Sequence, residues 1–121
     1  MESMDRPTSQ RKWIREEVCL LVAEYFRTKG LSATEKEKSQ EFISNVLRIR
    51  ERKITNSEIS DTFRNLNGIK MQFHAIRGID PDTPHKGTNS TMLQKRVFQE
   101  YLDNPARIKA EVYDVILKYY L

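Results

Sequence analysis

The chain has 121 residues, of which 38% are apolar and 31% are charged. That length fits a single domain, and the composition is typical of a globular chain rather than a disordered one. The formal net charge of +4 permits a polyanionic partner, but a merely solvated basic surface is equally compatible with it.

The chain contains one cysteine, Cys19, which excludes an internal disulfide and a CxxC metal site. It lies in an apolar run, so we expect a buried thiol in a reducing cytoplasm. No segment has the length of a signal peptide's apolar region or approaches the roughly 20 apolar residues of a membrane span. We expect a cytoplasmic protein with a disordered tail over 1–10 and one helical domain over 11–121.

Apolar residues at helical spacing predict a first helix over about 12–29, with Gly30 as its stop. A second helix is expected over about 35–50, beginning at a capping box formed by Thr34 and Glu37. A second apparent capping box, Thr55 with Glu58, predicts a short third helix over about 57–64.

The stretch Asn65-Leu66-Asn67-Gly68 reads as a tight turn, although Asn67 could instead cap the next helix. A fourth helix is expected over about 68–77. The short helix, the turn and this helix together have the size of a helix-turn-helix, so we predict such an element around 57–77.

The longest loop is expected over 78–90, where Lys86-Gly87 could meet a phosphate. A helix over about 91–102, capped by Asn89 or Ser90, should follow. Asn104 should cap a last helix that has Pro105 at its first position. The predicted fold class is all-α, a single domain of five to six helices, with a small β-hairpin at 49–56 or 78–90 left open.

Lys70, His74 and Arg77 share one face of the predicted fourth helix. They could contact a phosphate or a base edge, although His74 could equally be an ordinary neutral helix residue. Arg64 could pair with Asp61, cap carbonyls at a helix end or contact a phosphate. The basic residues that end the second helix, Arg48, Arg52 and Lys53, complement the helix dipole or contact phosphates.

Signatures of enzymes are scarce in this sequence. It contains no HExxH pattern and no glycine-rich phosphate loop of the Walker or Rossmann type. Cys19 lies in the apolar run of a predicted helix, which makes it a poor nucleophile. We therefore expect a non-catalytic chain without metal or cofactor.

Several motifs together resemble a known domain. Trp13 begins W-x-R-E-E-x-x-L-L-x-x-x-Y-F, and Thr62 begins T-F-R-N-x-N-G-I-x-M; Asp80-Pro81, Lys86-Gly87 and a final F-x-x-Y-L-D-N-P follow. Over about 11–118 the chain is similar to the N-terminal domain in front of HNH nuclease domains in bacterial restriction-type endonucleases. Gln72 and Ala75 depart from the family's pattern, in which a Lys and an Asn are expected. This chain carries no HNH motif.

The resemblance implies a DNA-binding module of the restriction or defence type, which in some relatives reads modified DNA while a nuclease domain or subunit cuts. The alternative from the residues is a protein-interaction or adaptor module that docks through its last helix, at Val112, Ile116, Tyr119 and Tyr120. Double-stranded DNA, modified or not, is thus the first expected partner. The candidate nucleic-acid-binding residues are Arg48, Arg52, Lys53, Arg64, Asn65, Asn67, Lys70, His74, Arg77 and Lys86.

Overall fold

The computed structural model describes residues 11–83 and 90–121, and five α-helices account for most of them. The helices are α1 (Arg15–Thr28), α2 (Ala33–Thr55), α3 (Leu66–Ile79), α4 (Met92–Asp103) and α5 (Pro105–Val115), and the π-helical turn η2 (Ile116–Tyr120) follows α5. The predicted all-α class is confirmed. The described ranges contain no strand, and residues 49–55 belong to α2, so a hairpin there is wrong. The expected tail over 1–10 and part of the 78–90 loop lie outside these ranges.

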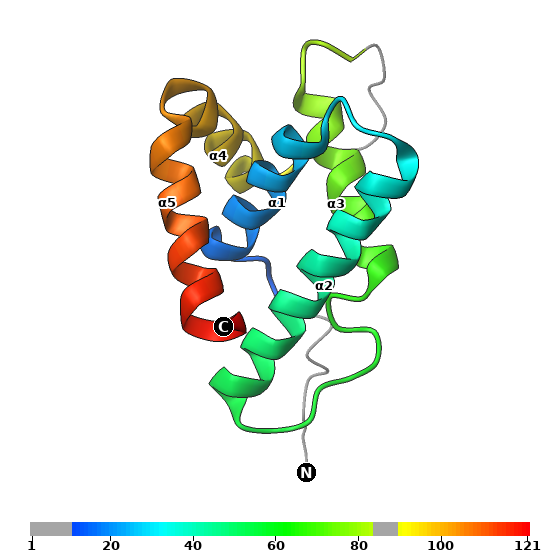
Figure 1. The fold of residues 1–121 in the computed structure, drawn as a ribbon, viewed down its shortest axis with the longest axis vertical. Helices are drawn as coiled ribbons and strands as arrows, with labels where there is room; N and C mark the ends of the chain where they lie inside the picture. Colours follow the sequence, from blue (N-terminus) through cyan, green and yellow to red (C-terminus); the bar gives the residue numbers. More distant parts are fainter. Residues whose placement is uncertain (1–10, 84–89) are drawn as a thin grey trace.

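Helix α1 occupies the centre of the bundle (Figure 1). It packs against each of the other four α-helices, with α4 and α5 on one side and α2 and α3 on the other. Five consecutive residues, 18–22, are at most 1% exposed. A helix that is apolar around its whole circumference must be surrounded, which is why this run places α1 inside. None of the helices in the described part is long and apolar enough to cross a lipid bilayer.

Helix α2 is longer than predicted at both ends. Its N-cap is Ser32, whose hydroxyl accepts a hydrogen bond from the Glu35 backbone N–H at 3.2 Å, so the predicted capping box at Thr34 is wrong. The predicted box at Thr55 is wrong as well. Thr55 is the last residue of α2 and its hydroxyl donates to the carbonyl of Glu51, while Asn56 ends the helix in the left-handed conformation at φ 53°.

The short helix predicted over 57–64 does not form. This segment consists of turns and irregular backbone, and α3 begins directly after it. The helix-turn-helix element predicted around 57–77 is therefore wrong: a single helix, α3, follows a non-helical connection (Figure 1). Asn65 rather than Asn67 is the N-cap, and its side-chain oxygen accepts from the Gly68 N–H at 2.9 Å. A Cβ at Gly68 would lie 3.3 Å from that oxygen, so glycine leaves room for the cap.

The C-terminal half follows the prediction closely. Thr91 caps α4 in a capping box with Gln94, whereas Ser90, one of the two predicted caps, donates to the carbonyl of Ala75. The other predicted cap, Asn89, lies outside the described residues. Asn104 caps α5 with Pro105 at the first position, as predicted.

Candidate nucleic-acid interface

Arg64 is the best-paired cation among the candidate residues. It is 5% exposed, and its guanidinium donates to both carboxylate oxygens of Glu17, at 2.9 and 3.0 Å. It also donates to the backbone carbonyls of Arg11 and Lys12, and its charge lies 3.9 Å from the centre of the Trp13 ring. The predicted pairing with Asp61 is wrong. In this placement every face of the guanidinium is engaged, which gives Arg64 a structural role and leaves it inaccessible to a phosphate.

We call Trp13, Glu17, Phe63, Arg64 and Asn65 the corner. The backbone at Arg64 is left-handed, with φ 48°, and the Arg64 carbonyl accepts from the hydroxyl of Ser44 at 2.8 Å. Phe63 is 1% exposed and Asn65 caps α3. The two motifs that carry the family resemblance, around Trp13 and around Phe63, thus meet in one buried structure.

Three other candidate cations lie at the far end of α2. Arg48 donates to the carbonyls of Ser60 and Phe63, at 3.1 and 2.6 Å, so it supports the connection before α3. Lys53 donates to the carbonyl of Tyr119, while Arg52 is exposed. Arg48 and Lys53 are thus used in holding neighbouring segments. None of the three residues lines the pocket that the basic residues of α3 share.

The predicted basic face of α3 exists. Lys70 and Arg77 are exposed, His74 is half-buried, and Asn67 is exposed in the first turn. The spacing of these residues along the helix places them on one side, with Ile69, Phe73 and Ile76 turned toward the core. Lys86, the remaining candidate, lies outside the described residues, as does its neighbour Gly87.

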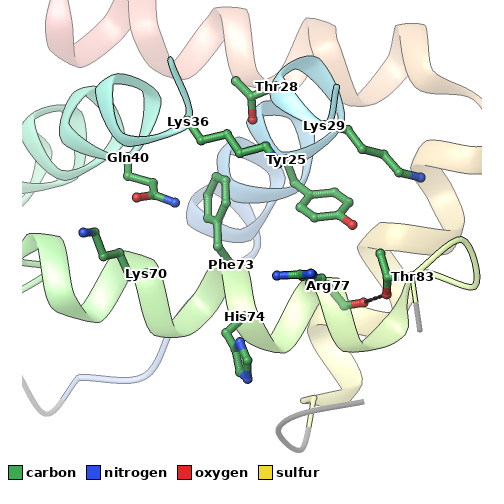
Figure 2. A pocket seen from close by; sticks show the side chains of 10 residues that line it. All are labelled: Tyr25, Thr28, Lys29, Lys36, Gln40, Lys70, Phe73, His74, Arg77 and Thr83. Atoms are coloured by element: carbon green, nitrogen blue, oxygen red, sulfur yellow. Dashed lines mark hydrogen bonds between the residues drawn. The ribbon is translucent and has the colours of Figure 1, made fainter. Parts of the chain in front are cut away.

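A pocket of about 410 Å³ lies between this face of α3, the C-terminal end of α1 and the first turns of α2. Figure 2 shows Lys36 and Gln40 reaching in from α2; Phe73 lies between Gln40 and the ring of Tyr25, and the Lys36 side chain runs above Phe73 toward Tyr25. Lys70 lines one end and the Arg77 side chain lies beneath Tyr25, whereas His74 points away from the centre. The pocket therefore has an aromatic floor and a rim that carries several cations.

A buried carboxylate fixes the α1 end of the pocket. Asp80 is 2% exposed and accepts hydrogen bonds from the Tyr25 hydroxyl at 2.6 Å and the Asp82 backbone N–H at 2.9 Å, with the Lys29 ammonium at 2.7 Å. Burial opposes its charged form, but the hydrogen bonds from Lys29 and Tyr25 outweigh burial and lower the pKa of Asp80 below its ordinary value. Burial and the bond to Asp80 raise the pKa of Tyr25. Lys29 is thereby committed to Asp80 and Asp82.

Two of the pocket's cations are left without such commitments. Among residues 11–83 and 90–121, the side chains of Lys36 and Arg77 form no ion pair and no hydrogen bond. Lys70 is bound at 2.9 Å to Glu37 in a pair whose two members are both nearly half exposed. A surface pair of this kind contributes little stability and exchanges readily for another anion.

Sequence reasoning missed Lys36, Gln40 and Tyr25 as members of this site. Lys36 and Gln40 lie on the polar side of α2, and their spacing is the signal that could have grouped them. No pattern within α2 could have revealed that this side faces α3, because that follows from long-range packing. Tyr25 is 7% exposed and belongs to the core as well as to the pocket lining.

The described residues contain no group of three or more His, Cys, Asp or Glu that could hold a metal ion. Cys19 is fully buried, and burial together with the nearby Glu111 carboxylate raises the pKa of its thiol to about 12. A thiol that stays protonated at neutral pH is a poor nucleophile.

Comparison with protein-family models, with curated proteins and with solved structures finds no match for this chain. The resemblance to the domain in front of HNH nucleases thus stays a prediction, carried by the motifs alone.

Proposed function

We propose that this chain is a DNA-binding module of the restriction or defence type, which contacts the duplex through the basic face of α3 and the adjacent start of α2. The observation that carries the proposal is the grouping of Lys36, Lys70 and Arg77 around one pocket, with Lys36 and Arg77 bound to no carboxylate of the described residues. Unpaired surface cations in one place are the electrostatic footprint expected of a phosphate-binding surface. The resemblance of the motifs at 13–26 and 62–71 supports the same function.

On this proposal the module does not cut DNA itself. A nuclease domain or subunit is the second partner that the resemblance suggests, and modified duplex DNA is a ligand to be tested beside unmodified DNA. The corner fixes the start of α3, because it contains the N-cap Asn65. Lys36, Lys70 and Arg77 contact phosphates. His74 and Asn67, on the outer side of α3, are the side chains positioned to meet groove edges.

The test is a salt titration of binding to short duplexes, unmodified and cytosine-modified, for the wild type and Lys36→Ala/Arg77→Ala. Each phosphate contact contributes about −0.9 to the slope of log affinity against log salt. The double variant should therefore reduce the magnitude of the slope by about 2. Its stability should stay within ~0.5 kcal/mol of the wild type, since neither side chain holds another described residue.

The matched control is Arg107→Ala/Lys109→Ala, which removes the same charge from exposed residues of α5. This control should bind as the wild type does. Equal losses in both double variants would mean that net charge, rather than the α3 surface, attracts DNA. Absence of binding to every duplex at low salt would overturn the proposal.

A second candidate function, protein–protein docking, rests on a different surface. Of the four predicted docking residues, Val112 is buried and Ile116 and Tyr119 pack against the core, whereas Tyr120 is 37% exposed. A second group of exposed apolar residues at this end, Tyr113, Leu117 and Leu121, lies at intervals of four residues, and these side chains are 61%, 47% and 79% exposed. Sedimentation equilibrium of the wild type against Tyr113→Ser/Leu117→Ser would show whether this stripe joins two copies.

A further inference from the structure

We infer that the pocket between α1, α2 and α3 accepts a single nucleotide, with its base against the exposed edges of Phe73 and Tyr25 and its phosphate at the cationic rim. The inference deepens the proposed function and rests on it to this extent: the expected source of the nucleotide is a residue unstacked from bound DNA. A free nucleotide offers the same chemistry, and the experiment below separates the two sources.

Size and lining are the first argument. A volume of about 410 Å³ falls within the range of pockets that hold small molecules, roughly 300–1,000 Å³. Two aromatic rings, Tyr25 and Phe73, lie edge to face with their centres 6.2 Å apart and form part of its lining. Tyr25 is 7% and Phe73 8% exposed, so only parts of the two rings reach the pocket. A base would meet these ring edges in the edge-to-face arrangement that aromatic pairs favour.

Charge is the second argument. The cations stand at the rim of the pocket. In the view of Figure 2 the Lys36 side chain runs above Phe73 toward Tyr25, and Arg77 lies on the opposite side of the Tyr25 ring. A ligand that satisfies both must be flat and apolar in one part and anionic in another. A purely anionic ligand would leave the aromatic floor unused, and a purely aromatic one would leave two cations without a counter-charge.

Polar groups at the site are the third argument. Gln40 carries an amide that forms no hydrogen bond within the described ranges, and it lines the pocket beside Lys36. An amide offers both a donor and an acceptor, which suits the edge of a base. The Tyr25 hydroxyl, by contrast, is committed to Asp80 and fixes the ring rather than the ligand.

The test fills the pocket without removing its charges. Gln40→Trp places a large side chain in the pocket and keeps Lys36, Lys70 and Arg77, and Gln40→Ala is the matched variant that leaves the pocket open. Affinity is measured for a fully paired duplex, for the same duplex with one unpaired nucleotide, and for a nucleoside monophosphate. Thermal unfolding confirms that both variants are folded.

We expect the wild type to bind the duplex with an unpaired nucleotide about tenfold more tightly than the paired duplex, since unstacking costs less there. Gln40→Ala, which lacks the amide but leaves the pocket open, should keep part of this preference. Gln40→Trp should lose this preference and keep its affinity for paired DNA. If Gln40→Trp instead weakens only the monophosphate, the pocket takes a free nucleotide. Should neither duplex bind while the monophosphate does, DNA binding fails and the nucleotide site stands. Equal affinity of wild type and Gln40→Trp for all three ligands overturns the inference.

Discussion

The corner and the α3 pocket use the same residue types in opposite ways. At the corner, Arg64 is buried and fully paired with Glu17, and its partners come from two segments of the chain, residues 11–17 and Ser44 in α2. At the pocket, Lys36 and Arg77 carry the same charge and meet no carboxylate of the described ranges. A buried charge must be satisfied within the protein, whereas an exposed one is stable in water and stays available for a ligand. Pairing therefore separates the cations that hold this fold from those that could bind.

The strongest way to break this contrast is to remove Arg64. Arg64→Ala would leave Glu17, which is 2% exposed, as a buried carboxylate without its guanidinium. Breaking a buried pair from one side costs about 3–5 kcal/mol. We expect a loss of that size in urea denaturation, together with loosening of the segment around Trp13.

The control for this change is Arg52→Ala, which removes an exposed arginine from the end of α2. Its effect on the free energy of unfolding should be within ~0.5 kcal/mol. A comparable loss in the two variants would show that burial and pairing do not distinguish these arginines.

Asp80 shares features of both regions, because it is buried like Arg64 but binds Lys29, a residue of the pocket. Asp80→Asn keeps the shape and removes the charge that Lys29 and the Tyr25 hydroxyl bind. Hydrogen bonds to charged groups contribute more than neutral ones, and we expect a loss of about 2 kcal/mol at neutral pH.

The lowered pKa of Asp80 also predicts how the stability difference between wild type and Asp80→Asn changes with pH. The pKa of Asp80 is lowered in the folded state, so its stabilisation is complete above the ordinary value of 3.8 and is lost as the pH falls through the folded value. The difference in stability between wild type and Asp80→Asn should therefore shrink on acidification below that value, as measured by urea denaturation at several pH values. A difference that stays constant into strong acid would contradict the assignment.

The cap of α3 has a smaller expected effect. Asn65→Ala removes the oxygen that accepts from the Gly68 N–H, at a cost of about 1 kcal/mol. Asn65→Asp keeps an acceptor and adds a favourable charge at the helix start, so it should match or exceed the wild type. If the two variants lose equally, the asparagine serves the turn rather than the cap.

The sequence predicts some features of the corner and of the α3 pocket better than others. Local signals correctly predicted three features: helical periodicity the all-α class, an apolar run the burial of Cys19, and the Asn-Pro pair the cap at Asn104. The basic face of α3 was found in the same way. Local patterns also produced false helix starts at Thr34 and Thr55, since an S/T-x-x-E pattern recurs by chance along a helix already rich in charge.

Long-range contacts explain what local patterns could not predict. Arg64 follows an apparent helix and invites a phosphate assignment, yet its carboxylate partner lies 47 residues earlier in the chain. Nothing in the sequence around Lys36 distinguishes it from the other charged residues of α2. It lines the same pocket as Arg77 only because α2 packs against α3. Residues that interact locally could be placed from the sequence, and residues that interact across the bundle could not.

The smallest change that tests the difference between structural and ligand-facing cations is Glu37→Gln. It removes the carboxylate from the exposed Lys70–Glu37 ion pair. Such pairs contribute about 0.2–1 kcal/mol, so stability should fall by no more than ~1 kcal/mol. Removal of a negative charge beside three cations should at the same time raise affinity for short duplexes about two- to fivefold at low salt, as read by fluorescence anisotropy. This gain should fade as salt screens the charges.

The matched control is Glu58→Gln, which neutralises an exposed carboxylate after the end of α2 and should change affinity less. A gain in affinity without a loss in stability is what separates a ligand-facing cation from a structural one. If Glu37→Gln leaves DNA affinity unchanged, Lys70 does not belong to the binding surface, and the proposal would rest on Lys36 and Arg77 alone.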